Sequence, residues 1–177
     1  MGLAKQAEEV ARAAHVGQVD KAGKPYITHP ARVAGRVRGN AELEAVAWLH
    51  DVVEDTPITL SDLLDAGFPE RVVVAVDAIT KREDESRDAY YVRVAADELA
   101  VQVKLADIDD NSDPGRLAAL EDQATRDRLA AKYAYARAAL TELPEGHRHP
   151  RPNARHRALP ERTRTSNAPV TGLHRGG

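Results

Sequence analysis

Residues 41–56 read AELEAVAWLHDVVEDT, and this stretch decides the fold. Apolar side chains recur through Leu43, Val46 and Leu49 at the spacing that places them on one side of a helix, and alanine, tryptophan and valine fill most of the remaining positions. A helix that is apolar on nearly every side lies in the centre of a protein. The stretch therefore predicts a buried helix over residues 41–55, around which the other elements pack.

Helical patterns continue on both sides of this segment. They cover residues 3–15, 30–38, 59–67, 69–80, 88–96, 97–111 and 116–143, the last broken near Asp122, with a turn at 112–115. Thr56 precedes a proline and should end the central helix, while Thr59 and Asp62 have the spacing of a capping box. The run VVVAVDAI at 72–79 resembles a strand, but its helical flanks favour a helix. The predicted class is all-α.

The composition excludes several kinds of protein. The chain has 177 residues and no cysteine, which excludes a disulfide scaffold, a cysteine-ligated metal centre and a thiol nucleophile. No apolar run approaches the roughly 18 residues that a membrane span needs, and the N-terminal segment is amphipathic rather than a signal sequence. We expect a cytoplasmic protein without a membrane partner. Nothing in the sequence indicates an oligomeric state.

The charge is distributed unevenly along the chain. Residues 144–177 hold seven arginines, two glutamates and five prolines, which leaves 18 basic and 26 acidic side chains for residues 1–143. With few large apolar side chains, the C-terminal segment cannot offset its ordering entropy. We therefore predict one domain over residues 1–143 and a basic, disordered tail over 144–177. The acidic charge of residues 1–143 argues against a nucleic-acid partner. We interpret the basic tail as a solvated extension in preference to a segment that contacts RNA or lipid.

An unusual group of ionisable residues lies at the end of the central helix. His50 and Asp51 interrupt its apolar run, and Glu54 and Asp55 follow one turn later. Buried carboxylates are costly unless they are paired or bind metal, and acids at a helix C-terminus oppose the helix dipole. A bound cation explains the group. The alternative is that the two acids are exposed at a helix end and His50 is an ordinary core histidine.

Two further segments offer ligands of the same kind. Asp107 interrupts an apolar run in VQVKLADIDDN at residues 101–111, and His29 lies in YITHP at residues 26–30. Together with His50 and Asp51 they make two imidazoles and two carboxylates. This mixed set of nitrogen and oxygen donors is typical of Mn²⁺ or Fe²⁺, is compatible with zinc, and does not suit calcium or magnesium.

Three motifs carry a resemblance to a known family. In this order, KPYITHP at 24–30, WLHDVVEDT at 48–56 and VKLADIDDN at 103–111 resemble the hydrolase domain of RelA/SpoT-type alarmone enzymes, within the HD phosphohydrolase superfamily. The resemblance covers about residues 7–135. It implies a compact multi-helix HD-domain fold. It also implies a small, stand-alone hydrolase that removes the 3′-pyrophosphate from (p)ppGpp and releases GDP or GTP and pyrophosphate.

The resemblance also implies roles for particular residues. The metal ligands, for Mn²⁺, are His29, His50, Asp51 and Asp107, and the pair that orients and activates the attacking water is Glu54 and Asp55. Asn111 and Tyr133 are the implied nucleotide contacts. The substrate is strongly anionic, and from their positions near these motifs we expect Lys21, Lys24, Lys81 and Lys104 to form a phosphate cradle.

Two other functions remain as alternatives. The loop before His29 carries Lys21 and Ala22 where the long alarmone enzymes have Arg and Ser, which leaves the adenine alarmones (p)ppApp open as substrates, and a nucleoside monophosphate is a further option. The second alternative is a non-catalytic, metal-bound interaction module. Such a module does not need His29, Glu54 and Asp55 intact, whereas the sequence retains all three.

Overall fold

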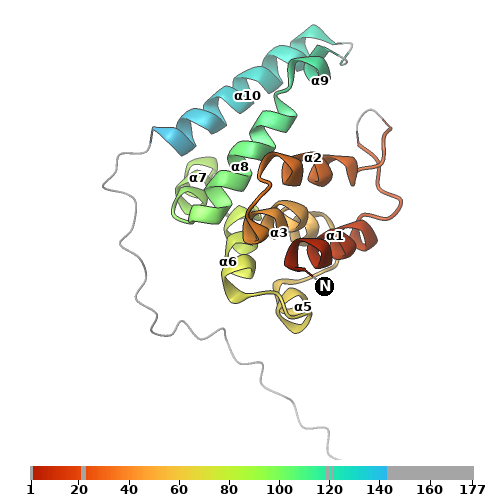
Figure 1. Cartoon of the computed structure of the whole chain (residues 1–177). Helices are drawn as coiled ribbons and strands as arrows, with labels where there is room; N and C mark the ends of the chain where they lie inside the picture. The colour runs from red at the N-terminus through yellow and green to blue at the C-terminus, as the bar shows by residue number, and fades with distance from the viewer. Residues whose placement is uncertain (1, 21–22, 119, 121, 143–177) are drawn as a thin grey trace, which may run out of the picture.

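The computed structural model describes residues 2–20, 23–118, 120 and 122–142, and this part of the chain holds ten helices (Figure 1). They are α1 (Leu3–Ala14), α2 (Thr28–Arg36), α3 (Ala41–Leu49), α4 (Val52–Asp55), α5 (Leu60–Asp65), α6 (Glu70–Ile79), α7 (Arg87–Ala95), α8 (Glu98–Asn111), α9 (Pro114–Ala118) and α10 (Gln123–Thr141). Among these residues, the β-structure consists of one isolated bridge between Val19 and Pro25. The predicted all-α class is confirmed.

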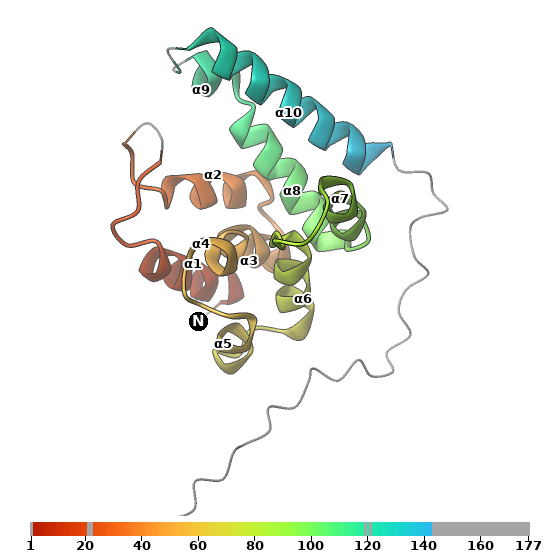
Figure 2. The same ribbon diagram turned by 180° about the vertical axis from the view of Figure 1, so that it is seen from behind.

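Helix α3 is the centre of the fold. It packs against α1, α2, α6 and α8, and the ribbon views from the front and from behind both show it enclosed by these helices (Figures 1 and 2). Its buried side chains lie on every side of the helix, and they are Leu43, Ala45, Val46, Ala47, Trp48 and Leu49. Burial of apolar surface on all sides of one helix supplies the main driving force for this arrangement.

The central helix is interrupted where the sequence predicted it to continue. Helix α3 ends at Leu49, and α4 begins at Val52 after a turn through His50 and Asp51. His50 Nδ1 lies 2.7 Å from the carbonyl oxygen of Ala47, which is the oxygen that the backbone N–H of Asp51 needs to extend the helix. The prediction of one helix over 41–55 is therefore wrong at this point, because a side chain competes for a helical hydrogen bond.

Most helix ends follow the sequence signals. Thr59 and Asp62 form the predicted capping box at the start of α5, and Thr56 ends α4 in an extended conformation. The run VVVAVDAI lies in α6, as predicted. The side chain of Asn40 accepts from the backbone N–H groups of Glu42 and Leu43 and caps α3.

The C-terminal half differs slightly from the prediction. The segment predicted as a turn at 112–115 contains the start of α9, because Pro114 suits the first turn of a helix. The expected break near Asp122 is present, and the side chain of Asp122 caps α10. Helix α10 packs against α7 and α8 (Figure 2). The predicted tail, residues 144–177, lies outside the described residues. In the described part of the chain, every helix is too short or too polar to cross a bilayer.

Candidate metal centre

Predicted ligands from three separate segments meet at one buried point. His29 lies at the start of α2, His50 follows α3, and Asp107 lies in α8; a ligand atom from each is within 4.8 Å of the other two. His29 Nε2 is 3.1 Å from Asp107 Oδ1. Asp51 completes the set, with its Oδ2 3.1 Å from His50 Nε2 and 3.8 Å from His29 Nε2. The packing of α2, α3 and α8 thus brings all four predicted ligands together.

Hydrogen bonds behind the rings determine which imidazole nitrogen faces this point. His29 Nδ1 lies 2.8 Å from Asp110 Oδ2, and His50 Nδ1 lies 2.7 Å from the Ala47 carbonyl oxygen. A carboxylate or a carbonyl only accepts, so each Nδ1 carries the proton and donates. In the neutral form of each ring, the lone pair is therefore on Nε2, which faces the carboxylates. This is the orientation that metal-binding histidines adopt.

The electrostatics of the centre favour positive charge. Burial lowers the pKa of His29, but hydrogen bonds with Asp107 and Asp110 outweigh it and raise the value to about 9. Burial also raises the pKa of Asp51, yet the charge of His50 moves it well below its usual range. Two carboxylates stay ionised here and stabilise positive charge on the imidazoles. A divalent cation brings positive charge of its own, so it fits the site electrostatically.

One buried nitrogen in the centre has no hydrogen-bond partner among the described residues. It is Nε2 of His50, whose side chain is almost fully buried. Such an atom costs free energy unless something binds it. A cation held by two imidazole nitrogens and two carboxylates would use this lone pair, and the donor set suits Mn²⁺, Fe²⁺ or zinc. The residues present therefore fit a metal.

Tyr26 supports the centre from the loop before α2. Its hydroxyl donates to Asp51 Oδ2 at 2.6 Å, and burial together with the charge of Asp51 raises its pKa, so it remains a donor. Asp55 lies close to both residues, and burial followed by the charges of Asp51 and Glu54 raises the pKa of its carboxyl. Sequence reasoning missed Tyr26, although it stands in the YITHP motif that contains His29.

Glu54 lies in the short helix α4, which is separate from the helix that precedes His50. Its carboxylate accepts from Lys81 in the loop after α6, where the backbone N–H lies at 3.2 Å and Nζ forms an ion pair. Burial lowers the pKa of Lys81, but the bond with Glu54 outweighs it and raises the value. A predicted catalytic residue and a predicted phosphate-binding residue are thus partners.

The other predicted substrate contacts divide into two groups. Lys104 Nζ and Asn111 Nδ2 both donate to Asp107, at 2.7 and 2.5 Å, and Tyr133 is near enough for the charge of Asp107, after burial, to raise its pKa. These three residues therefore lie beside the centre. Lys24 is exposed in the loop before α2, and its backbone N–H donates to Asp20. Lys21 lies outside the described residues.

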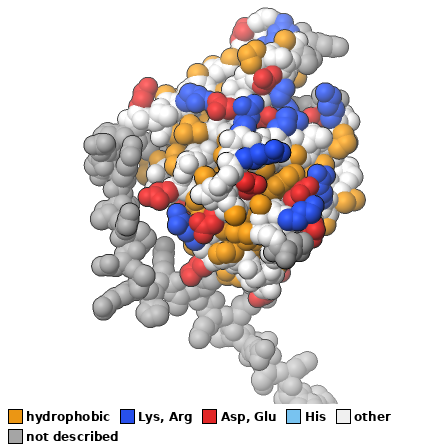
Figure 3. All heavy atoms as spheres, in the orientation of Figure 1, with side chains coloured by type: hydrophobic (Ala, Val, Ile, Leu, Met, Phe, Trp, Pro, Cys, Tyr) orange, Lys and Arg blue, Asp and Glu red, His pale blue; other side chains and the backbone are white. Residues whose placement is uncertain are grey.

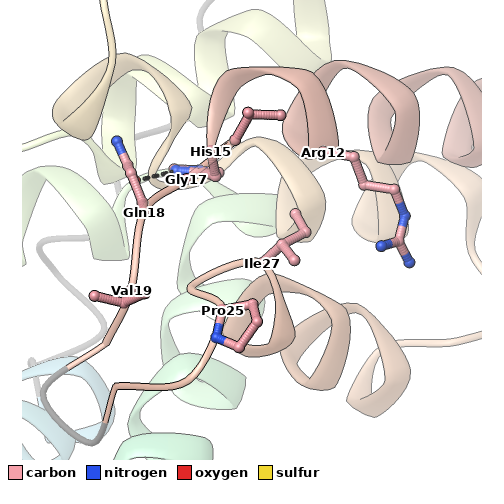
Figure 4. A pocket seen from close by; sticks show the side chains of 8 residues that line it. Arg12, His15, Gly17, Gln18, Val19, Pro25 and Ile27 are labelled. Atoms are coloured by element: carbon pink, nitrogen blue, oxygen red, sulfur yellow. Dashed lines mark hydrogen bonds between the residues drawn. The ribbon is translucent and has the colours of Figure 1, made fainter.

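A pocket of about 300 Å³ lies behind the loop that carries Tyr26 (Figure 4). His15 and Gln18 line it, and His15 Nδ1 lies 2.7 Å from Gln18 Oε1, which Figure 4 marks with a dashed line. The amide of Gln18 also donates to the backbone oxygen of Asp55 at 3.0 Å. Gln18 therefore ties the end of α4 to the end of α1, which positions the segment with Glu54 and Asp55.

Known proteins resemble this chain, with its helical architecture and its buried cluster of two histidines and two aspartates, in sequence or in fold. No family model matches the chain. A Vibrio cholerae protein named guanosine-3′,5′-bis(diphosphate) 3′-pyrophosphohydrolase is 44% identical over 80 residues. A Synechocystis protein with the same name, qualified as probable, is 36% identical over 107 residues. The resemblance inferred from the motifs is confirmed.

These alignments are partial. They cover 44% and 52% of this chain but 11% and 14% of the two relatives, so the chain spans a small part of their length. A solved structure described as a metazoan ortholog of SpoT that hydrolyzes ppGpp aligns with a TM-score of 0.67 and 22% identity, over 84% of this chain and 90% of that one. The chain therefore shares the fold of that structure.

Proposed function

We propose that this chain is a hydrolase that removes the 3′-pyrophosphate from (p)ppGpp and releases GDP or GTP and pyrophosphate. One observation carries the proposal: three motifs on separate segments bring two imidazoles and two carboxylates to one buried point, beside a pair of acids and several basic groups. The names of the relatives supply the substrate class.

We propose Mn²⁺ as the metal and His29, His50, Asp51 and Asp107 as its ligands. The Nε2 of His50, which makes no hydrogen bond although it faces Asp51, and the mixed nitrogen and oxygen donor set support this choice. Such a metal, when bound, lowers the pKa of a water molecule and offsets the charge of the phosphate.

In this proposal Glu54 and Asp55 orient the attacking water and accept its proton. Burial and the charges of Asp51 and Glu54 raise the pKa of Asp55, which makes its carboxylate a better proton acceptor. The water oxygen attacks phosphorus, the bond to the 3′-oxygen breaks, and the 3′-oxygen takes a proton. Tyr26 holds Asp51 in place through its hydrogen bond.

The anionic substrate is bound by the basic and polar groups beside the centre. We propose Lys81 and Lys104 as phosphate contacts and Asn111 and Tyr133 as nucleotide contacts, with Lys21 and Lys24 contributing from the loop before α2. Lys104 uses one of its three N–H groups on Asp107, which leaves two for a phosphate.

A product assay tests the function. The full chain with Mn²⁺ is incubated separately with ppGpp, ppApp and a nucleoside 5′-monophosphate, and the products are separated by anion-exchange chromatography. We expect ppGpp to yield GDP and pyrophosphate. Consumption of ppApp or the monophosphate alone would replace the substrate, and a metal-loaded protein that consumes none of the three would be a binding module.

A further inference from the structure

Asp110 is a buried acid next to the centre to which the motifs assign no role. It lies in α8, three residues beyond Asp107, and its exposed fraction is 1%. A buried carboxylate is rare unless it is paired. Asp110 contacts the imidazole of His29 on one side and arginines on the other, so it connects a proposed metal ligand to the surface of the protein.

Three arginines surround this single carboxylate. Arg32 donates through Nε to Oδ1 at 2.8 Å and through a terminal nitrogen to Oδ2 at 3.0 Å. Arg36 and Arg116 approach to 3.8 and 3.5 Å without a hydrogen bond. Figure 3 shows basic side chains interspersed with acids on the face of α2, α9 and α10. The two charge-assisted hydrogen bonds from Arg32 pair this carboxylate inside the protein.

Both oxygens of Asp110 accept hydrogen bonds. Oδ2 accepts the proton of His29 Nδ1 at 2.8 Å, and both oxygens accept from Arg32. An ionised carboxylate cannot donate, so His29 is restricted to the tautomer with its Nε2 lone pair toward Asp107. The bidentate arginine fixes the plane of the carboxylate, which in turn fixes the plane of the imidazole.

We propose that Asp110 is the positioning residue of the metal centre, which holds His29 in the metal-binding tautomer and orientation while Arg32, Arg36 and Arg116 hold Asp110. Partners behind a metal-ligating histidine typically contribute about 10- to 100-fold to metal affinity. The inference rests on the metal site of the proposed function, but not on its substrate. A carboxylate that only ties α2 to α8 would affect stability and leave the metal unaffected.

The test compares variants of the full chain by Mn²⁺ and Co²⁺ titration. Asp110→Asn removes the charge and places an NH₂ donor against either His29 Nδ1 or Arg32 Nε, so we expect metal affinity to fall about 10- to 100-fold. Arg32→Gln keeps the carboxylate, so we expect it to lower the melting temperature and to retain most of the affinity. Asp109→Asn is the matched control: the same change on the next residue, whose exposed side chain pairs with Arg137, should leave affinity unchanged.

The outcomes separate this inference from the function on which it rests. If the wild-type chain binds neither metal, the proposed function fails and the inference fails with it. If the wild type binds and a folded Asp110→Asn variant binds equally well, only the inference is overturned. Long-range ¹H–¹⁵N correlation spectra of the wild type loaded with zinc give a check that needs no variant, because a proton on Nε2 of His29 instead of Nδ1 also overturns it.

Discussion

Glu54 accepts hydrogen bonds from both the backbone and the side-chain nitrogen of Lys81, although 27 residues separate the two in sequence. The pair joins the end of α4 to the loop after α6. It brings a proposed proton acceptor and a proposed phosphate-binding group into direct contact. Glu54 uses one of the three N–H groups of the Lys81 ammonium, so a phosphate can bind Lys81 while this pair is kept.

Replacing Glu54 by Gln tests its role in proton transfer. The amide keeps the shape and one acceptor oxygen but cannot take up a proton at neutral pH. We expect turnover of ppGpp to fall about 10²- to 10⁴-fold, with Mn²⁺ content unchanged. Steady-state kinetics and metal analysis on the same preparation check this. Asp55→Asn should behave similarly, and the loss of turnover in the double variant should be far smaller than the product of the two single losses. Unchanged turnover in Glu54→Gln would refute the assignment.

Replacing Lys81 by Met tests the phosphate contact. The change keeps an apolar stem and removes a charged donor, which is worth about 1.5–3 kcal/mol in such hydrogen bonds. We expect kcat/KM for ppGpp to fall about 10- to 100-fold, chiefly through KM. Arg82→Met is the control, because Arg82 neighbours Lys81 but pairs with the exposed Asp77. Equal losses in the two variants would mean that general surface charge matters rather than this position.

The proposed ligands could be predicted from the sequence because each interrupts an apolar run. His50 and Asp107 are conspicuous in buried helices, and a polar residue in such a place needs a reason. Asp110 stands in the same run as Asp107, but its partner His29 is 81 residues away. Sequence spacing does not reveal such a contact, since it depends on how α2 packs against α8.

The position of Glu54 could not be predicted for a different reason. Helical spacing alone placed it one turn from His50, but the imidazole takes the Ala47 carbonyl and ends the helix. A single side-chain hydrogen bond thus accompanies a break in the helix that the apolar pattern predicts. Propensity patterns describe regular elements, and this irregular turn lies at the centre of the proposed site.

Removal of His50 tests the metal centre as a whole. His50→Ala deletes an almost fully buried imidazole that faces Asp51 at 3.1 Å. The acids that remain are then buried with less compensation, which destabilises the fold. We expect the variant to lose bound Mn²⁺ and activity together and to melt at a lower temperature. Metal analysis decides the point, since full occupancy would show that His50 is not a ligand.

The metal-free protein should become less stable at alkaline pH. The pKa of His29 in the folded protein is about 9, above the ordinary value of 6.5. A raised pKa contributes stability that is fully present below pH 6.5 and is lost as the pH rises through 9. We expect the melting temperature of chelator-treated protein to fall between pH 7 and 9.5. Metal affinity should rise over the same range because protons compete less; a flat melting profile without metal would contradict the assignment.

Gln18 offers a test of the link between the pocket and the catalytic segment. Its side chain pairs with His15 at 2.7 Å and donates to the Asp55 backbone oxygen at 3.0 Å. Gln18→Met keeps the length of the side chain but leaves a buried imidazole nitrogen without its partner, which costs about 1–3 kcal/mol.

We expect this variant to unfold at lower denaturant concentration and to have a lower kcat, because the end of α4 is no longer held. Its Mn²⁺ content should equal that of the wild type, since none of the proposed ligands contacts Gln18. Gln102→Met serves as the control: that glutamine lies in α8, and its amide donates to the backbone oxygen of Glu98 on its own helix. A loss of stability with full kcat would limit Gln18 to a structural role.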